Sequence, residues 1–328
     1  EQWHALGLDL PPLAALGYHR LEIGEAKESL SLIVHPPRCH QPQAVTDSRR
    51  VCGLSGQLSG VRAARNWGSG DFPDLRHLIE WAAQAGADLV GVNPLHALFP
   101  HNPRHASPYS PSSREFLNTL YIDVTAVPEY AECAPARALV ETPDFQARLS
   151  ALRDAEMVDY AGVSQLKSTL LEQLYRHFRN QHLDAGTQRA QDFRAYQTQG
   201  GMDLARFALY QALQEHLYAL DNNNWGWPAW PEEYRDPASD AVAAFATAQQ
   251  DRVEYFQYQQ WLAATQLDAA GALALARGLG VGLYQDLAVG VDLGGADTWS
   301  NRDLYAIGAR IGCPPDDFSL LGQDWGLP

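Results

Sequence analysis

At 328 residues the chain is long enough for one large domain or two ordinary ones, and its 46% hydrophobic content is typical of a globular protein. The formal net charge of -15 argues against a nucleic-acid partner, because phosphate binding requires a basic surface. No run of about 18 apolar residues occurs, so we expect neither a membrane span nor a membrane partner.

The four cysteines are widely separated and form no CxxC pair; they are Cys39, Cys52, Cys133 and Cys313. This pattern fits neither a zinc site nor a dense disulfide framework, and it favours a reducing compartment. No secretory signal peptide is visible, although the sequence starts at Glu1 without a methionine. We therefore expect a cytoplasmic protein.

The first segment predicts β structure. Residues 17–23 (GYHRLEI) and 29–36 (SLSLIVHP) are apolar-rich runs separated by a polar stretch, which is typical of a hairpin. Two strands are marginal by themselves, so we interpret residues 1–45 as the end of a small N-terminal β domain.

A β-loop-α-β pattern follows in residues 46–100. VCGLSGQLSGV (51–61) predicts a short buried strand, and DLVGVNPLHALFP (88–100) predicts a second strand with its loop. Between them, apolar residues recur at helical spacing before a glycine that would end the helix; they are Leu75, Leu78, Ile79, Ala82 and Ala83, followed by Gly86. Such a unit implies that the two strands are parallel.

Residues 101–270 have a mostly helical pattern, and an insertion of this size commonly shapes the mouth of an active site. Helices are expected at 160–178, 202–220 and 253–266, with a further one at 267–280. VGLYQDLAVGV (281–291) then predicts a third, buried parallel strand within the last region, 271–328.

Asp286 is the single acid in that third strand. It lies near the carboxyl end, which faces the active site in a β/α barrel, so a functional role is one interpretation. The alternative is an aspartate that caps the next loop or binds a backbone amide. Position alone does not decide between them.

Aromatic residues in loops are candidate sugar contacts, although most aromatics in any globular chain belong to the core. Tyr109 projects from a serine- and proline-rich turn in residues 106–124. Gln323 and Trp325 bracket one residue, so their side chains should point the same way in an extended loop. Further candidates are Trp225, Trp227, Trp230 and Trp299.

Other chemistries lack a motif. The histidines show no HExxH spacing, and His96, His101 and His105 have no partner of a metal motif. There is no GxSxG elbow and no GxxxxGK[ST] loop, and GVDLGGAD lacks the GxGxxG order. We therefore expect no metal and no phosphate-bearing cofactor.

Taken together, six stretches resemble the amylomaltases, the bacterial 4-α-glucanotransferases of glycoside hydrolase family 77. They are ARNWGSGDFPDL, GVNPLHALFP, SPYSPSSREFLN with the following LYIDV, WGWPAWPE, GLYQDLAVGVDLGGADTW and CPPDDFSLLGQDWGLP. The matches run from about Gln57 to Pro328 in the order and spacing of the family.

The resemblance implies an α/β fold, the first three strands of a (β/α)₈ TIM barrel with a large helical insertion after strand two. It implies transfer of α-1,4-glucan segments between maltooligosaccharides without a cofactor. The family's mechanism is retaining: a carboxylate attacks the anomeric carbon while a second carboxylic acid protonates the leaving oxygen. An acceptor sugar then takes the glycosyl group.

Residue by residue, the resemblance implies that Tyr109 is the donor-side tyrosine of the SPY motif. Asp286 matches an acid that binds substrate and supports the nucleophile. Gln323 and Trp325 match the GQxW pair near the scissile bond, and Tyr160 matches a tyrosine of a proposed secondary glucan site.

The sequence also departs from the family. Long members commonly have Arg where Gln285 stands and Tyr where Ser59 stands. The nucleophile Asp of an RxDH-type stretch, the acid/base Glu of an EDLG stretch and a third carboxylate in an HD stretch follow the GQxWGxP loop in the family, and none of these stretches occurs here. We therefore expect the chain as given to be inactive; the alternatives are a non-catalytic glucan-binding fragment or pseudoenzyme, or a related hydrolase.

Overall fold

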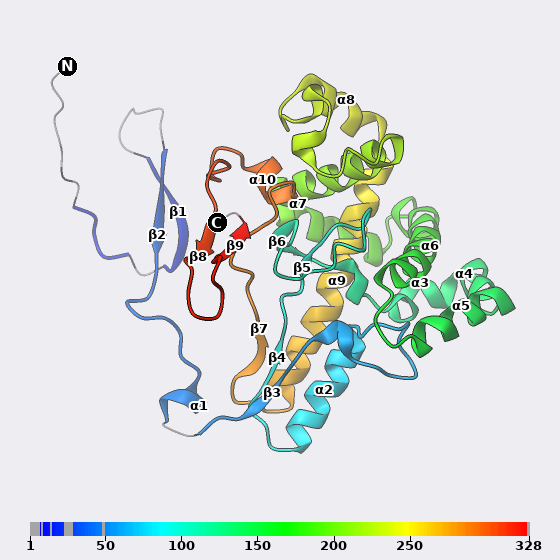
Figure 1. The fold of residues 1–328 in the computed structure, drawn as a ribbon, viewed down its shortest axis with the longest axis horizontal. Helices are drawn as coiled ribbons and strands as arrows, with labels where there is room; N and C mark the ends of the chain where they lie inside the picture. The colour runs from blue at the N-terminus through cyan, green and yellow to red at the C-terminus, as the bar shows by residue number, and fades with distance from the viewer. Residues whose placement is uncertain (1–6, 8, 14, 23–28, 48–49, 327–328) are drawn as a thin grey trace. The chain divides into compact units, whose positions relative to one another are not determined.

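The computed structural model describes the chain except residues 1–6, 8, 14, 23–28, 48–49 and 327–328 (Figure 1). It divides into two compact units, residues 1–50 and 51–328. None of the helices in the described part of the chain has the length and apolar character required for a membrane span.

The first unit contains a β-hairpin and one short helix. Strand β1 (Gly17–Glu22) pairs antiparallel with β2 (Ser29–Val34), and α1 (Gln43–Thr46) follows. The predicted hairpin is thus confirmed, although most of its polar connection lies outside the described residues. Tyr18, Leu30 and Ile33 expose more than half of their surface, so this ribbon buries little apolar area of its own.

The second unit is built around a three-stranded parallel sheet in the order β3-β4-β7. Its strands are β3 (Gly53–Gly56), β4 (Leu89–Val92) and β7 (Gly282–Gln285), as the sequence predicted. Only β4 is buried, because it has a strand on each side and α2 packs against it. The prediction that the other two strands are buried was wrong: β3 is largely exposed, and Tyr284 of β7 is 62% exposed.

Helix α2 (Phe72–Gln84) connects β3 to β4. Asp71 accepts a hydrogen bond from the backbone of Asp74, and the Asp74 side chain accepts one from the backbone of Asp71 in return, which forms a capping box. The chain leaves the helix at Gly86 with φ of 76°, a conformation that favours glycine. The expected helix and its stop are therefore confirmed.

Helices dominate the chain between β4 and β7, on one side of the sheet in Figure 1. The elements there are β5 (His96–Ala97), β6 (Ser113–Leu117), α3 (Pro128–Glu132), α4 (Ala134–Val140), α5 (Pro143–Asp154), α6 (Tyr160–Phe178), the π-helical turn η4 (Arg179–Leu183), α7 (Gln188–Leu220), α8 (Asp240–Ala248) and α9 (Gln250–Ala276). After β7 come α10 (Ala296–Ser300), β8 (Ile311–Cys313) and β9 (Gln323–Gly326). Short 3-10 turns are η1 (Leu58–Gly60), η2 (Thr119–Tyr121), η3 (Val124–Ala126), η5 (Trp227–Ala229) and η6 (Glu232–Tyr234).

One helix agrees with the sequence prediction and another differs from it. The backbone of Gly201 is non-helical, with φ of 52° and ψ of -137°, so it separates α7 into two helices, and residues 202–220 form the second one as predicted. The two helices predicted at 253–266 and 267–280 are a single helix, α9, which continues through Gly271 and is followed by Gly278 with φ of 75°. Alanine and leucine surround Gly271, so its modest propensity cost does not end the helix.

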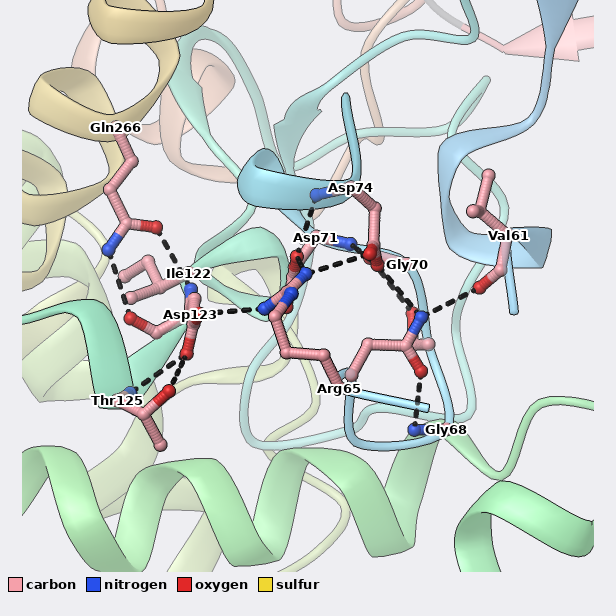
Figure 2. A network of polar contacts seen from close by, with 12 residues as sticks. Val61, Arg65, Gly68, Gly70, Asp71, Asp74, Ile122, Asp123, Thr125 and Gln266 are labelled. Atoms are coloured by element: carbon pink, nitrogen blue, oxygen red, sulfur yellow. Dashed lines mark hydrogen bonds and ion pairs between the residues drawn. The ribbon is translucent and has the colours of Figure 1, made fainter. Parts of the chain in front are cut away.

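A buried charge cluster joins the start of α2 to the helical region (Figure 2). The Arg65 guanidinium binds Asp71, Asp74 at 2.7 Å and Asp123 at 2.7 Å. Asp123 in turn binds Gln266 of α9 through its backbone, with both hydrogen bonds visible in Figure 2. The cluster ties three segments that are distant in sequence.

The charges in this cluster depend on one another. Burial by itself lowers the pKa of Arg65, but hydrogen bonds to Asp71 and Asp74 raise it above its ordinary value. Burial raises the pKa of Asp71, although the hydrogen bond from Arg65 opposes this. The side chains of Asp71 and Asp74 are only 2% exposed, so their desolvation is costly, and the ion pairs with the guanidinium offset part of that cost.

Candidate functional site

Tyr109 and Trp325 together line a cavity of about 600 Å³. Tyr109 is 58% exposed and Trp325 is 46% exposed, so neither belongs to the core. The rest of the lining is Ser107, Ser110, Val289, Gly290, Arg310, Asp324 and Gly326. The structure thus brings together two residues that the sequence picked out from distant stretches.

The Tyr109 loop is held against the segment that follows β7. The Ser110 hydroxyl donates to Asp292 at 3.3 Å, and the Asp292 N–H donates to the Pro111 carbonyl at 2.8 Å. The Ser112 hydroxyl accepts from the Ala296 N–H at 3.0 Å. A Cβ on Gly295 would lie 2.5 Å from the Ser112 carbonyl oxygen, so the glycines of GVDLGGAD allow two backbones to approach closely.

Arg114 and His96 fix the other end of the same segment. Arg114 Nη1 donates to the carbonyls of Ala288 and Val289 at 3.3 and 3.0 Å, and the Ala288 N–H donates to His96 Nε2 at 3.2 Å. Burial lowers the pKa of His96, and the charge of Arg114 acts in the same direction, which favours the neutral ring that can accept this bond. The wall of the cavity at Val289 is therefore anchored by charged and polar groups from β5 and β6.

The β8–β9 hairpin and the preceding Arg310 supply another part of the lining. Trp325 Nε1 donates to Gln323 Oε1 at 2.8 Å, so the two side chains lie on one side of β9 as the sequence predicted. Because the amide oxygen is the acceptor, the Gln323 NH₂ group is the donor that this pair presents. Arg310 and Asp324 form an exposed ion pair beside Trp325. A Cβ on Gly312 would lie 2.0 Å from the Gln323 carbonyl oxygen, so this hairpin requires glycine there.

Gln323, Asp286 and Tyr160 are not among the residues that line the cavity, although Gln323 binds Trp325, which is. Asp286 directly follows β7, its N–H donates to the Val92 carbonyl at 3.2 Å, and its charge acts on the His96 ring. Tyr160 begins α6, and its hydroxyl lies 3.2 Å from that of buried Ser59. Gln285 ends β7 and is exposed.

The other tryptophan candidates divide by burial. Trp225 is 50% exposed, whereas Trp227, Trp230 and Trp299 belong to the core. The indole of Trp230 donates to Gln214 at 3.0 Å, and that of Trp299 donates to the Tyr234 carbonyl at 3.1 Å. For these three residues the core interpretation is correct.

Sequence reasoning missed Arg114, Arg310 and Asp324 in and around the cavity. Arg114 stands in the SPYSPSSREFLN stretch, but nothing in its spacing showed that it would reach the residues after β7. Arg310 and Asp324 meet only when the hairpin closes, because β8 and β9 are joined by the long loop 314–322.

Comparison with known proteins gives consistent matches. The family model described as 4-alpha-glucanotransferase (Glyco_hydro_77) matches residues 56–328. The 4-alpha-glucanotransferase of Haemophilus influenzae is 39% identical over 98% of this chain and 46% of its own length, and that of Mycobacterium bovis is 37% identical over 100% of this chain and 44% of its own. The crystal structure of amylomaltase from Corynebacterium glutamicum superposes with a TM-score of 0.76 at 29% identity, covering 97% of this chain and 42% of that one.

The chain thus spans less than half the length of both curated relatives. Its mixed α/β fold is similar to that of amylomaltase. Because the family model covers most of the sequence, the chain belongs to the 4-alpha-glucanotransferase family, glycoside hydrolase family 77.

Proposed function

We propose that this chain carries the glucan-binding part of a 4-α-glucanotransferase, which transfers α-1,4-glucan segments between maltooligosaccharides. The observation that carries the proposal is the cavity shared by Tyr109 and Trp325. Its volume of about 600 Å³ lies within the range of small-molecule sites, and its lining combines two aromatic rings with a few polar groups. Such a lining suits a sugar, which has apolar faces and hydroxyl edges.

Within this site, Tyr109 is the donor-side platform, and the Gln323–Trp325 pair holds the glucan near the scissile bond. Asp286 supports the nucleophile from the carboxyl edge of the sheet, where barrel enzymes place their acids. Tyr160 belongs to a secondary glucan site. The hydrogen bonds that hold the Tyr109 loop on the residues after β7 support this assignment, because they keep the cavity walls in place without substrate.

The sheet of β3, β4 and β7 forms the first three strands of a (β/α)₈ barrel. Residues 101–270 are the insertion after strand two, and residues 271–328 supply strand three and the substrate loop. Residues 46–100 supply strands one and two, and residues 1–45 end a small β domain. The parallel order of the three strands supports this assignment.

The transfer is a retaining double displacement without a cofactor. That chemistry needs two carboxyl groups about 5–5.5 Å apart, a nucleophile and an acid/base. The family's RxDH, EDLG and HD stretches are not among these 328 residues. We therefore expect the chain by itself to bind glucans without turning them over, and transfer to require a protein extended to the length of the relatives.

The experiment is an assay with maltotriose, analysed by chromatography of the products. The extended protein should form glucose together with longer oligomers, and the 328-residue chain should form neither. Release of glucose without any longer oligomer would favour the hydrolase instead.

Calorimetry of the 328-residue chain with maltoheptaose tests the part of the proposal that concerns glucan binding. Binding without turnover is the expected result for the chain alone. Turnover by a chain of verified mass would contradict our placement of the catalytic carboxylates, and a failure to bind by a folded chain would contradict the assignment of the cavity.

A further inference from the structure

Outside the cavity, three side chains with metal-binding atoms converge at the end of α3. They are Glu132, the last residue of α3, His177 of α6 and His182 of the π-helical turn η4. Glu132 Oε2 lies 2.9 Å from His182 Nε2 and 3.4 Å from His177 Nε2, and one ligand atom from each residue lies within 4.8 Å of the others.

The π-helical turn accounts for this convergence. On a regular α-helix, residues five apart point about 140° away from each other, because each residue advances by about 100°. The wider turn of residues 179–183 carries His182 round to the side of His177, and their ring centroids are 6.4 Å apart. Such turns are often found at functional sites.

The spacing of the atoms fits a tetrahedral ion. Zinc binds imidazole nitrogen and carboxylate oxygen at about 2.0–2.2 Å, so two ligand atoms in a tetrahedral site are about 3.4 Å apart. The separations of 2.9 and 3.4 Å require only a small adjustment to reach this. Two imidazoles with one carboxylate form a ligand set that zinc commonly uses.

The surroundings also suit an ion. His182 Nδ1 lies 3.1 Å from the Thr187 hydroxyl, which can donate to this nitrogen or accept from it. Accepting from Nδ1–H leaves the Nε2 lone pair free for a metal, and this is how proteins usually orient histidine ligands. The Glu132 side chain is 47% exposed, so solvent reaches the site and can supply a fourth ligand.

We propose that Glu132, His177 and His182 form a binding site for a divalent zinc-like cation that joins α3 to the end of α6. The ion ties two helices of the region between β4 and β7, and it takes the place of the imidazole protons that now face the carboxylate. The site is separate from the Tyr109–Trp325 cavity, whose lining contains none of the three residues.

The test is a titration of the 328-residue chain with zinc chloride, followed by calorimetry. Exposed Cys39 and Cys52 are first changed to serine, because free thiols also bind zinc. We expect one ion per chain with micromolar affinity or better, and at least 100-fold weaker binding after His177→Ala or His182→Ala. The matched control is His77→Ala, an exposed histidine on α2, which should bind like the parent.

A second readout covers the case in which a histidine variant folds poorly. Glu132→Gln keeps the size of the side chain and removes the charge, so it should retain the circular dichroism of the parent and still lose at least tenfold in affinity. Bound cobalt should give strong visible absorption bands of a four-coordinate site. The proposal would be overturned if the parent showed no zinc binding with a dissociation constant below 100 µM, or if the histidine variants bound zinc as the parent does.

Discussion

Trp230 and Trp325 show how differently two regions of this molecule use the same side chain. Trp230, between α7 and α8, is completely buried against Tyr210 and Trp299 and donates its indole N–H to buried Gln214. Trp325, on β9, is 46% exposed and donates its indole N–H to a neighbour on its own strand. In the first region the indole N–H binds a side chain from another element. In the second it binds a neighbour on the same strand, and the Trp325 ring stays partly exposed.

Charged groups follow the same division. In the interior, Arg65 binds three carboxylates from different segments, and Lys167 donates to the carbonyls of Leu120 and Ile122 at 2.6 and 2.7 Å. Beside the cavity, Arg310 forms an ion pair with Asp324 across an exposed hairpin. Stability should therefore depend on the first set of charges, and binding on the residues of the second region.

The largest expected effect is the loss in the free energy of unfolding caused by Arg65→Ala. Removing the guanidinium leaves the carboxylates of Asp71 and Asp74 buried without their ion-pair partner, and breaking a buried ion pair in this way costs about 3–5 kcal/mol. Urea unfolding followed by circular dichroism measures the change. The matched control is Arg310→Ala, which removes an exposed partner and should leave the midpoint of unfolding unchanged. Equal shifts in the two variants would show that burial does not separate these regions.

A smaller effect, about 3 kcal/mol, should come from His101 as the pH falls. The ring is mostly buried between Phe99 and Tyr218, and this burial lowers its pKa from 6.5 to about 4. The unfolded chain therefore takes up a proton near pH 6.5, whereas the folded chain does so only near pH 4. The stabilisation is complete above pH 6.5 and is lost as the pH falls toward 4.

Unfolding measured at pH 7 and pH 4.5 checks this sign. His101→Gln should flatten the decline between the two values, whereas His77→Gln, on an exposed face of α2, should follow the parent. A decline of the same size in His101→Gln would assign the pH dependence to other groups.

Elements with a strong local pattern could be predicted from the sequence. The helix at 160–178 has its apolar residues at helical spacing throughout, and its observed bounds agree with the prediction. The exposure of β3 and β7 could not be predicted. Leu283 of β7 and Val90 of β4 are both apolar residues in short apolar runs, and only the sheet order distinguishes an outer strand from the central one. Local pattern describes the element, but not its neighbours.

The candidate site shows the same limit. Tyr109, Gln323 and Trp325 stand out as aromatic and amide side chains in loops, and motif resemblance gives them roles. The alignment of Gln323 with Trp325 follows from strand alternation. The cluster of Glu132, His177 and His182 had no signal of this kind, because a spacing of five becomes a shared face only in a π-helical turn. Arg310 and Asp324 likewise depend on the closure of a hairpin whose loop is long.

The smallest expected effect in energy, and the most direct test of the comparison, is Trp325→Ala. Trp325 is 46% exposed and is not among the core residues, so the midpoint of unfolding should stay within error. Loss of its face from the cavity should weaken maltoheptaose binding about tenfold, or about 1.4 kcal/mol. Phe318→Ala is the matched control, because Phe318 is a fully exposed aromatic in the loop of the same hairpin and does not line the cavity. If both variants lose affinity equally, hydrophobic exposure rather than the cavity explains binding; if Trp325→Ala unfolds the chain while affinity per folded molecule is unchanged, Trp325 is a structural residue like Trp230.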